Sequence, residues 1–249
     1  MKKLLTLLMF VRLSAVGQDY IIKHPNDTIK CTIKKVKRGK VGNVESLSYV
    51  KEKSNVLIDI DYDKIKKFKC QDSIITNVGY LEFPKNKETG KVCFSNVVET
   101  GKSKNDMYVL GKEWFVNNFK SSNDVIQMDS KEDGIIMGKG FSRIPWVFML
   151  STGYYDLYYT IKLSFKENKY KYEITDFIVK YPGATVSGVY YPPSETPLEL
   201  TKFSDENFLN DKKPRKTDLD TRAIIHEKMS GFEISIKNAL AKEKPKEDW

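Results

Sequence analysis

Histidine is scarce in this sequence, and other residues of common catalytic sites are missing from it. The 249 residues include two histidines, His24 and His226. We expect them to lie in different domains, which excludes a serine-histidine triad and a multi-histidine metal site. The sequence also lacks a glycine-flanked nucleophilic serine and a phosphate-binding loop. Many hydrolase classes are thereby excluded, and we predict no cofactor, no metal and no catalytic residue.

No apolar run reaches the roughly 20 residues that a membrane-spanning helix needs. The run Leu4–Val11 follows two lysines and precedes small residues, an order typical of a secretory signal peptide. We assign residues 1–17 to that peptide and expect cleavage near Gly17–Gln18. The mature chain is therefore expected to be exported, periplasmic or extracellular, and to have no transmembrane segment.

Cysteine is also sparse, with three residues. Three cysteines in an exported chain allow one disulfide and leave one thiol unpaired. Cys31 and Cys70 fall in the same predicted domain and are the candidate pair. Cys93 lies in a predicted strand and is expected to be a small buried residue.

Basic residues exceed acidic ones, and without the leader 39 of them face 33 acidic residues, a net charge of +6. Much of the excess lies in one run: Lys34, Lys35, Lys37, Arg38 and Lys40. A polyanion such as nucleic acid or an acidic glycolipid could bind there. We favour a solvated strand end protected by lysines, because no aromatic residues are interleaved with the run. We predict no nucleic-acid partner.

Short alternating segments separated by polar turns predict a small all-β domain over residues 19–75. The pattern is clear on both sides of the turn at Pro25–Asp27 and continues to Phe68. Residues 76–90 end in a polar stretch bounded by proline and glycine, which predicts a linker.

Residues 91–249 predict an α+β domain with the element order β-α-β-β-β-β-α. Ser103 and Asp106 have the spacing of a capping box, and apolar residues then recur at helical spacing as far as Phe119. Gly111 lies on that apolar stripe, which indicates close packing against a sheet.

Hairpin signals follow this helix. Val125–Asp129 and Ile135–Lys139 flank a turn closed by Asp133 and Gly134. The alternation then continues in Leu157–Phe165 and in a partner strand.

In that partner strand the apolar residues stand at even positions before Asp176 and at odd positions after it, which indicates a bulge or a bend. Tyr181–Pro197 is predicted to be a long surface loop, in which Tyr190 and Tyr191 could stack on a sugar or a peptide. We favour packing of this loop onto its own domain. An amphipathic core helix is predicted over residues 220–241.

Three segments of the second domain resemble a known family. They are ETGKVCFSNVVET, GKSKNDMYVLGKEWFVNNF and DVIQMDSKEDGIIMGKG, within Leu81–Gly140. They resemble the secreted Bacteroidetes family called the domain of unknown function with TBP-like fold, and the later elements match it by their order. The resemblance implies a curved antiparallel sheet with two helices on one face, and it implies no reaction and no ligand.

If both helices cover one face, alternate residues of the two clearest strands lie on the other face. They are Tyr158, Thr160, Lys162, Ser164, Lys171, Glu173 and Thr175. We predict a partner surface there, for an envelope protein or a glycan, and an exported, non-enzymatic binding or structural module. The alternatives are a carboxylate-based hydrolase of cell-wall or glycan material and a polyanion-binding protein.

Overall fold

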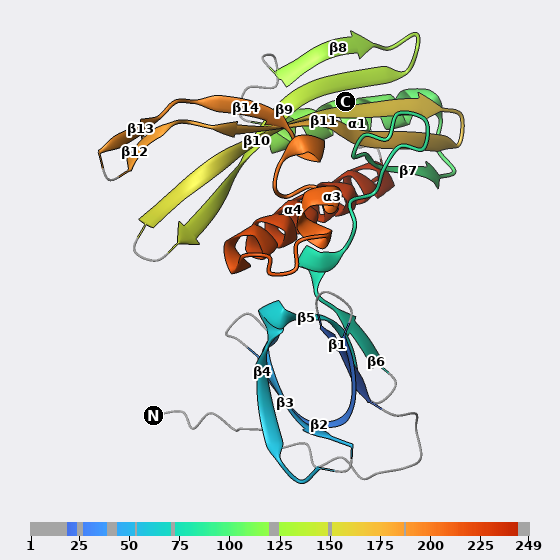
Figure 1. Cartoon of the computed structure of the whole chain (residues 1–249). Helices are drawn as coiled ribbons and strands as arrows, with labels where there is room; N and C mark the ends of the chain where they lie inside the picture. Colours follow the sequence, from blue (N-terminus) through green and yellow to red (C-terminus); the bar gives the residue numbers. More distant parts are fainter. Residues whose placement is uncertain are drawn as a thin grey trace, which may run out of the picture. The chain divides into compact units, whose positions relative to one another are not determined.

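The computed structural model describes residues 19–23, 27–38, 44–52, 54–70, 73–119, 125–148, 151–186 and 188–243. The predicted signal peptide and His24 lie outside these ranges. The chain divides into two compact units, residues 1–77 and 78–249 (Figure 1). Within the described ranges, no helix is both long and apolar enough to cross a membrane.

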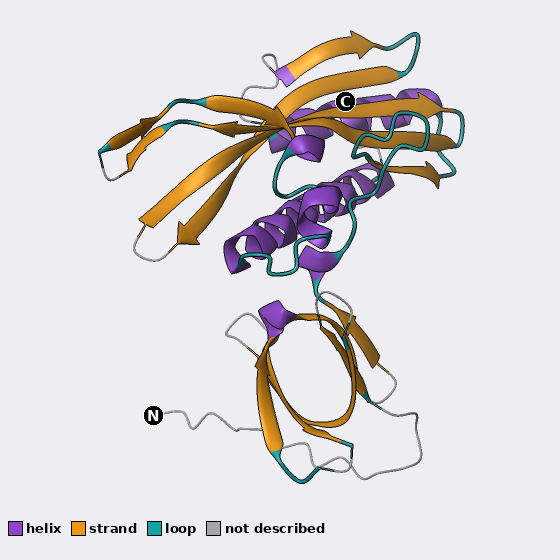
Figure 2. Cartoon of the chain, in the orientation of Figure 1, coloured by secondary structure: helices purple, strands orange, loops and turns teal. Residues whose placement is uncertain are grey.

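Unit 1 is one antiparallel sheet of six strands in the order β4-β3-β2-β1-β5-β6. The strands are β1 (Tyr20–Lys23), β2 (Thr28–Arg38), β3 (Val44–Lys51), β4 (Leu57–Asp61), β5 (Ile65–Cys70) and β6 (Ser73–Thr76), with a 3-10 turn η1 (Tyr62–Lys64) before β5. The sheet curls around its own apolar core (Figure 2). Ile21, Leu47, Ile65 and Phe68 are completely buried in this core.

Unit 2 contains an antiparallel sheet in the order β14-β11-β10-β9-β8, in which β7 also pairs with β11. The strands are β7 (Phe94–Glu99), β8 (Ile126–Ser130), β9 (Ile135–Phe148), β10 (Ser151–Lys166), β11 (Lys169–Tyr181) and β14 (Ser194–Pro197). A separate hairpin is formed by β12 (Ala184–Val186) and β13 (Val189–Tyr191). The strands β12, β13 and β14 occupy the segment that was predicted to be a loop, and that prediction was wrong.

Two long helices pack on one face of this sheet (Figure 2). They are α1 (Lys104–Asn118) and α4 (Lys216–Ala241), and the shorter elements are η2 (Val78–Tyr80), η3 (Leu198–Leu200) and α3 (Asp205–Leu209). The predicted cap is confirmed, because the Ser103 side chain accepts a hydrogen bond from the Asp106 amide. The final helix begins at Lys216, four residues earlier than predicted.

The close approach of α1 to the sheet depends on glycine. A β-carbon at Gly111 would lie 2.5 Å from Phe165 Cζ, and one at Gly138 on β9 would lie 2.7 Å from Phe115 Cε1. Both distances are shorter than packed carbon atoms allow. Gly111 therefore permits the close packing against the sheet that its position in the helix predicted.

The predicted hairpin and bulge are both present. β8 pairs with the start of β9 through a turn in which Gly134 has φ +67. On β11, Asp176 has φ +53, and the register with β10 shifts between Tyr158 and Thr160. The extra residue of the bulge lets both Ile174 and Phe177 point into the core, although they are three positions apart, and both are buried.

A buried arginine fastens the start of unit 2 to α4. The Arg222 side chain has no exposed surface and donates hydrogen bonds to the carbonyl oxygens of Gly79, Leu81 and Phe203 and to the Asp205 carboxylate. Its guanidinium also lies 4.4 Å from the centre of the Phe83 ring. The stretch 76–90, predicted to be a linker, thus contributes Phe83 to a packed interior.

His226 lies beside this arginine and is also buried. Its ring stacks on Phe83 with a centroid separation of 4.6 Å, and its Nε2 donates to the Leu81 carbonyl oxygen at 3.2 Å. Burial lowers the pKa of His226 from 6.5 to about 4, although the hydrogen bond with Leu81 opposes this shift. The ring is therefore neutral at neutral pH and acts as a packing residue.

Two glycine-to-alanine substitutions should have opposite effects on stability. Gly111→Ala places a methyl group against the buried Phe165 ring, and we expect the free energy of unfolding to fall by about 1–2 kcal/mol. A β-carbon at Gly231, on α4, meets no atom within 4 Å. Gly231→Ala should therefore raise the free energy of unfolding by up to about 1 kcal/mol. Urea denaturation measures both, and equal effects would contradict the close approach at Gly111.

Arg222→Met should destabilise unit 2 strongly. The substitution leaves the Asp205 carboxylate and several carbonyl groups without their buried donor, and we expect a loss of about 3–5 kcal/mol. Lys216→Met is the matched control, because Lys216 forms an exposed ion pair with Asp220, and we expect a loss of less than about 1 kcal/mol. Similar losses in thermal or urea unfolding would show that Arg222 is not a structural anchor.

The stability of the protein should depend on pH through His226. Between pH 6.5 and about 4 the unfolded chain binds a proton at this site and the folded chain does not. This contribution to stability is complete above pH 6.5 and falls with decreasing pH by at most about 1.4 kcal/mol per unit. His226→Gln should lack it, so the difference between the two unfolding curves over this range is the measurement. Parallel curves would exclude this role.

Candidate functional site

The face of the unit 2 sheet opposite the helices is the candidate site, and we call it the open face. Along β10, Leu157, Tyr159 and Ile161 point into the core beneath α1 and α4. Because side chains alternate along a strand, Tyr158 and Lys162 point to the other side, where they are half-buried. Among the described residues, no helix packs on this side.

An aromatic pair lies in the middle of the open face. Phe141 on β9 is the register partner of Tyr158 on β10, and their rings stack with centroids 5.3 Å apart. The Lys180 ammonium of β11 lies 4.5 Å from the centre of the Tyr158 ring. Phe141 keeps 53% of its surface exposed. A cation therefore sits against an exposed aromatic platform.

A second aromatic-cation contact continues along the same strands. The Arg143 guanidinium lies 3.8 Å from the centre of the Tyr154 ring. It also donates to both Asp156 oxygens, with its Nε at 3.0 Å from Oδ1. Lys180 is ion-paired with Glu195 of β14 at 2.5 Å. Carboxylates thus hold the cations in place beside the tyrosines.

The remaining predicted residues lie at the other end of the open face. Thr160 is paired with Lys139 on β9 and with Thr175 on β11, and it is 7% exposed. Glu173 is opposite Lys162 in register but forms its ion pair with Lys171, at 2.6 Å. Within the described ranges, no carboxylate lies within ion-pair distance of Lys162.

Residues 94–180 match the model of a family described as a domain of unknown function (DUF4468) with TBP-like fold. This part of unit 2 is therefore similar to DUF4468 domains. The match confirms the resemblance and runs beyond Gly140 to include β10 and most of β11. The α+β class with a TBP-like fold is confirmed.

Two solved structures resemble this chain. One is a DUF4468 family protein from Bacteroides ovatus, with 18% sequence identity, a TM-score of 0.50, and coverage of 65% of this chain and 93% of that chain. The other is a TBP-like protein from Parabacteroides distasonis, with 16% identity, a TM-score of 0.47, and coverage of 64% and 98%. Comparison with curated proteins finds no match. At such identity, the likeness to the first structure shows the fold alone.

The two tyrosines singled out in the predicted loop Tyr181–Pro197 are exposed. Tyr190 and Tyr191 lie on β13 and keep 66% and 51% of their surface accessible. We expected the loop to pack onto its own domain; Tyr190 and Tyr191 do not, whereas Ser194–Pro197 pairs with β11 as β14. The hairpin forms its own hydrogen-bonded ladder with Ala184–Val186, so its backbone is satisfied without burying the rings. Whether these rings contact a partner stays a prediction.

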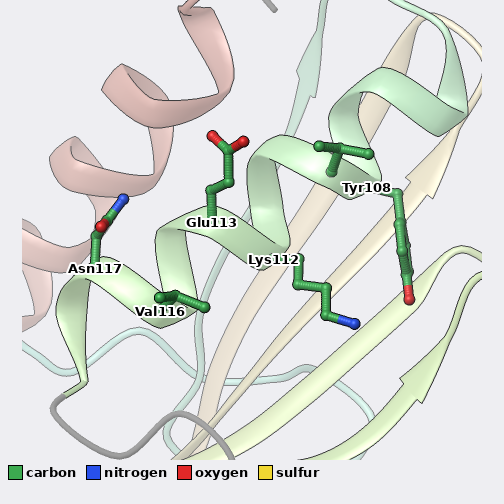
Figure 3. Close-up of a pocket in the computed structure, with 6 residues that line it drawn as sticks. Tyr108, Lys112, Glu113, Val116 and Asn117 are labelled. Atoms are coloured by element: carbon green, nitrogen blue, oxygen red, sulfur yellow. The ribbon is translucent and has the colours of Figure 1, made fainter.

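A pocket of about 240 Å³ lies on the outer side of α1 in unit 2 (Figure 3). Its lining residues are Tyr108, Val109, Lys112, Glu113, Val116 and Asn117. Figure 3 shows the Tyr108 hydroxyl and Lys112 on one side of the helix, with Glu113 pointing elsewhere. A second pocket, of about 360 Å³, is lined by residues of both α1 and α4, including Glu113 and Asn117 again.

Asp129 of β8 connects the first pocket to the sheet edge, and sequence reasoning did not find this contact. Its carboxylate accepts hydrogen bonds from the Tyr108 hydroxyl and from Lys112, the latter at 2.6 Å. These two bonds lower the pKa of Asp129, with Lys112 the larger cause. Burial and the Asp129 carboxylate raise the pKa of Tyr108 to about 12. The tyrosine stays protonated, so the cluster orients α1 and offers no nucleophile at neutral pH.

The cysteines are free thiols in the structure. Cys31 and Cys70 lie at corresponding positions of β2 and β5, the two strands that flank β1. Burial raises the pKa of Cys31 to about 11 and also raises the pKa values of Cys70 and Cys93. The disulfide between Cys31 and Cys70 stays a prediction. Among the described residues, no group of three or more His, Cys, Asp or Glu side chains is arranged to hold a metal ion.

Proposed function

We propose that this protein is an exported, non-enzymatic binding module of the bacterial cell envelope, and that the open face of its DUF4468 domain contacts the partner. The observation that carries the proposal is the stacked pair of exposed Phe141 and half-buried Tyr158, with Lys180 against the Tyr158 ring. An exposed aromatic patch surrounded by charged groups is typical of a recognition surface. The charged leader followed by an apolar run supports export.

The position of this patch also supports binding. Phe141 and Tyr158 lie on the long strands β9 and β10, which pair over fourteen successive positions. Side chains that strands hold in place lose little conformational freedom when a partner binds. Recognition by a rigid surface therefore needs no rearrangement of the sheet.

Carboxylate chemistry receives no support from the open face. Asp156, Glu173 and Glu195 each accept hydrogen bonds from a neighbouring cation, respectively Arg143, Lys171 and Lys180. A glycoside hydrolase needs two carboxyl groups that face one substrate bond, one of them protonated. Here the carboxylates act as counter-ions, which favours binding over hydrolysis.

The double substitution Tyr158→Ala and Lys162→Glu tests the open face. With the mature tagged protein as bait in envelope extracts, we expect a specific partner, identified by mass spectrometry. The double variant should bind the purified partner at least about tenfold more weakly, because an aromatic contact and a charge are lost. The stability of the variant should stay close to that of the wild type, because neither residue lies in the core.

Lys212→Glu, on the connection before α4, provides the matched charge change away from the open face. It should leave partner binding unchanged. Undiminished binding by the double variant would exclude the open face as the contact surface. A cytoplasmic protein that keeps residues 1–17 would contradict export.

A further inference from the structure

Three neighbouring strands of unit 1 carry charge of one sign. β2, β1 and β5 lie side by side in the sheet, and the three contain no aspartate or glutamate. Their basic residues are Lys23, Lys30, Lys34, Lys35, Lys37, Arg38, Lys66, Lys67 and Lys69. Asp59 and Asp61 lie on β4, on the far side of β3. The charge is therefore segregated across the sheet.

An aromatic residue lies in the middle of these strands. Tyr20 on β1 is the register partner of both Lys30 on β2 and Lys69 on β5. Ile21 is completely buried in the core, so by alternation its neighbours Tyr20 and Ile22 point outward. Neighbouring strands are about 4.8 Å apart, which places one lysine on each side of the tyrosine.

The next row of outward side chains has an aliphatic residue in the middle and a lysine on one side only. Ile22 is opposite Lys67 on β5 and Thr28 on β2. Among the described residues, Lys30, Lys67 and Lys69 have no ion-pair partner. Their charges are thus available to a ligand. We call this outward surface, made by Tyr20, Ile22, Lys30, Lys67 and Lys69, the lysine face.

We propose that the lysine face binds an acidic polysaccharide. The lysines supply charge complementarity to carboxylate or sulfate groups spaced along a polymer. Tyr20 and Ile22 supply an apolar strip against which the flat faces of sugar rings pack. The run from Lys34 to Lys40 has no aromatic residue of its own. The sheet supplies one from a separate strand.

Other polyanions fit this surface less well. Single-stranded nucleic acid is held by several aromatic side chains on which successive bases stack, whereas the lysine face has one ring. An anionic membrane surface favours apolar side chains that insert beside the cations, and the exposed Val56 and Leu57 lie at β4, beyond β3. An acidic glycan needs only cations and a narrow apolar strip. The lysine face belongs to a different unit from the open face, so each proposal is tested separately.

The test is binding of the mature chain to heparin and to polygalacturonate over a series of salt concentrations. Both should bind, with log affinity falling linearly against log salt, and Lys30→Ala or Lys69→Ala should each reduce the slope by about one. Tyr20→Thr should weaken binding about tenfold with the slope unchanged, because it removes stacking and no charge. Tyr20→Phe, which keeps the ring, should bind like the wild type.

Two control variants distinguish binding at the lysine face from nonspecific attraction to the positive charge of the whole protein. Lys64→Ala removes an exposed lysine of the same unit, and Lys212→Ala removes an exposed lysine from the connection before α4; both should leave affinity and slope unchanged. The proposal is overturned if Lys64→Ala weakens binding as much as Lys30→Ala, or if Tyr20→Thr has no effect while remaining folded by circular dichroism. Tighter binding to oligothymidylate or to phosphatidylglycerol vesicles than to either glycan would also overturn it.

Discussion

The burial of one guanidinium group constrains the architecture of unit 2. Arg222 has no exposed surface, and its hydrogen bonds reach residues near 80 and near 204 that are far apart in the sequence. A buried charge that lost these partners would cost several kcal/mol, so the entering chain and the α3 region must meet α4 in one arrangement. Because α4 is fixed in this way against one face of the sheet, it does not cover the opposite, open face.

Local features of this fold follow directly from the sequence. Ser103 and Asp106 form the predicted cap, Gly134 closes the predicted hairpin, and the parity change near Asp176 becomes a bulge. Each of these features depends on residues within a few positions of one another. The open face also follows, because alternation along a strand determines which residues share a side once the helices are placed.

Contacts between distant residues did not follow from the sequence, because no local pattern encodes them. Arg222 lies 143 positions from its acceptor Gly79, and Asp129 lies 21 positions from Tyr108. Tyr20 joins Lys30 and Lys69 only because β1 lies between β2 and β5. A row of lysines next to a tyrosine therefore looks like unrelated sequence segments until the strand order is known.

The outer edge of β11 is shared by two short strands. β7 pairs with Lys169–Ile174 and β14 with Ile178–Tyr181, and the bulged residue Asp176 lies in the gap between them. At the opposite edge, the five-residue β8 covers part of β9. A long, flat, unpaired edge is where copies of a sheet protein add to one another and aggregate. On this side the sheet therefore ends in two short strands separated by a bulge, an edge that disfavours the addition of further strands, although β9, β10 and β11 are each thirteen to sixteen residues long.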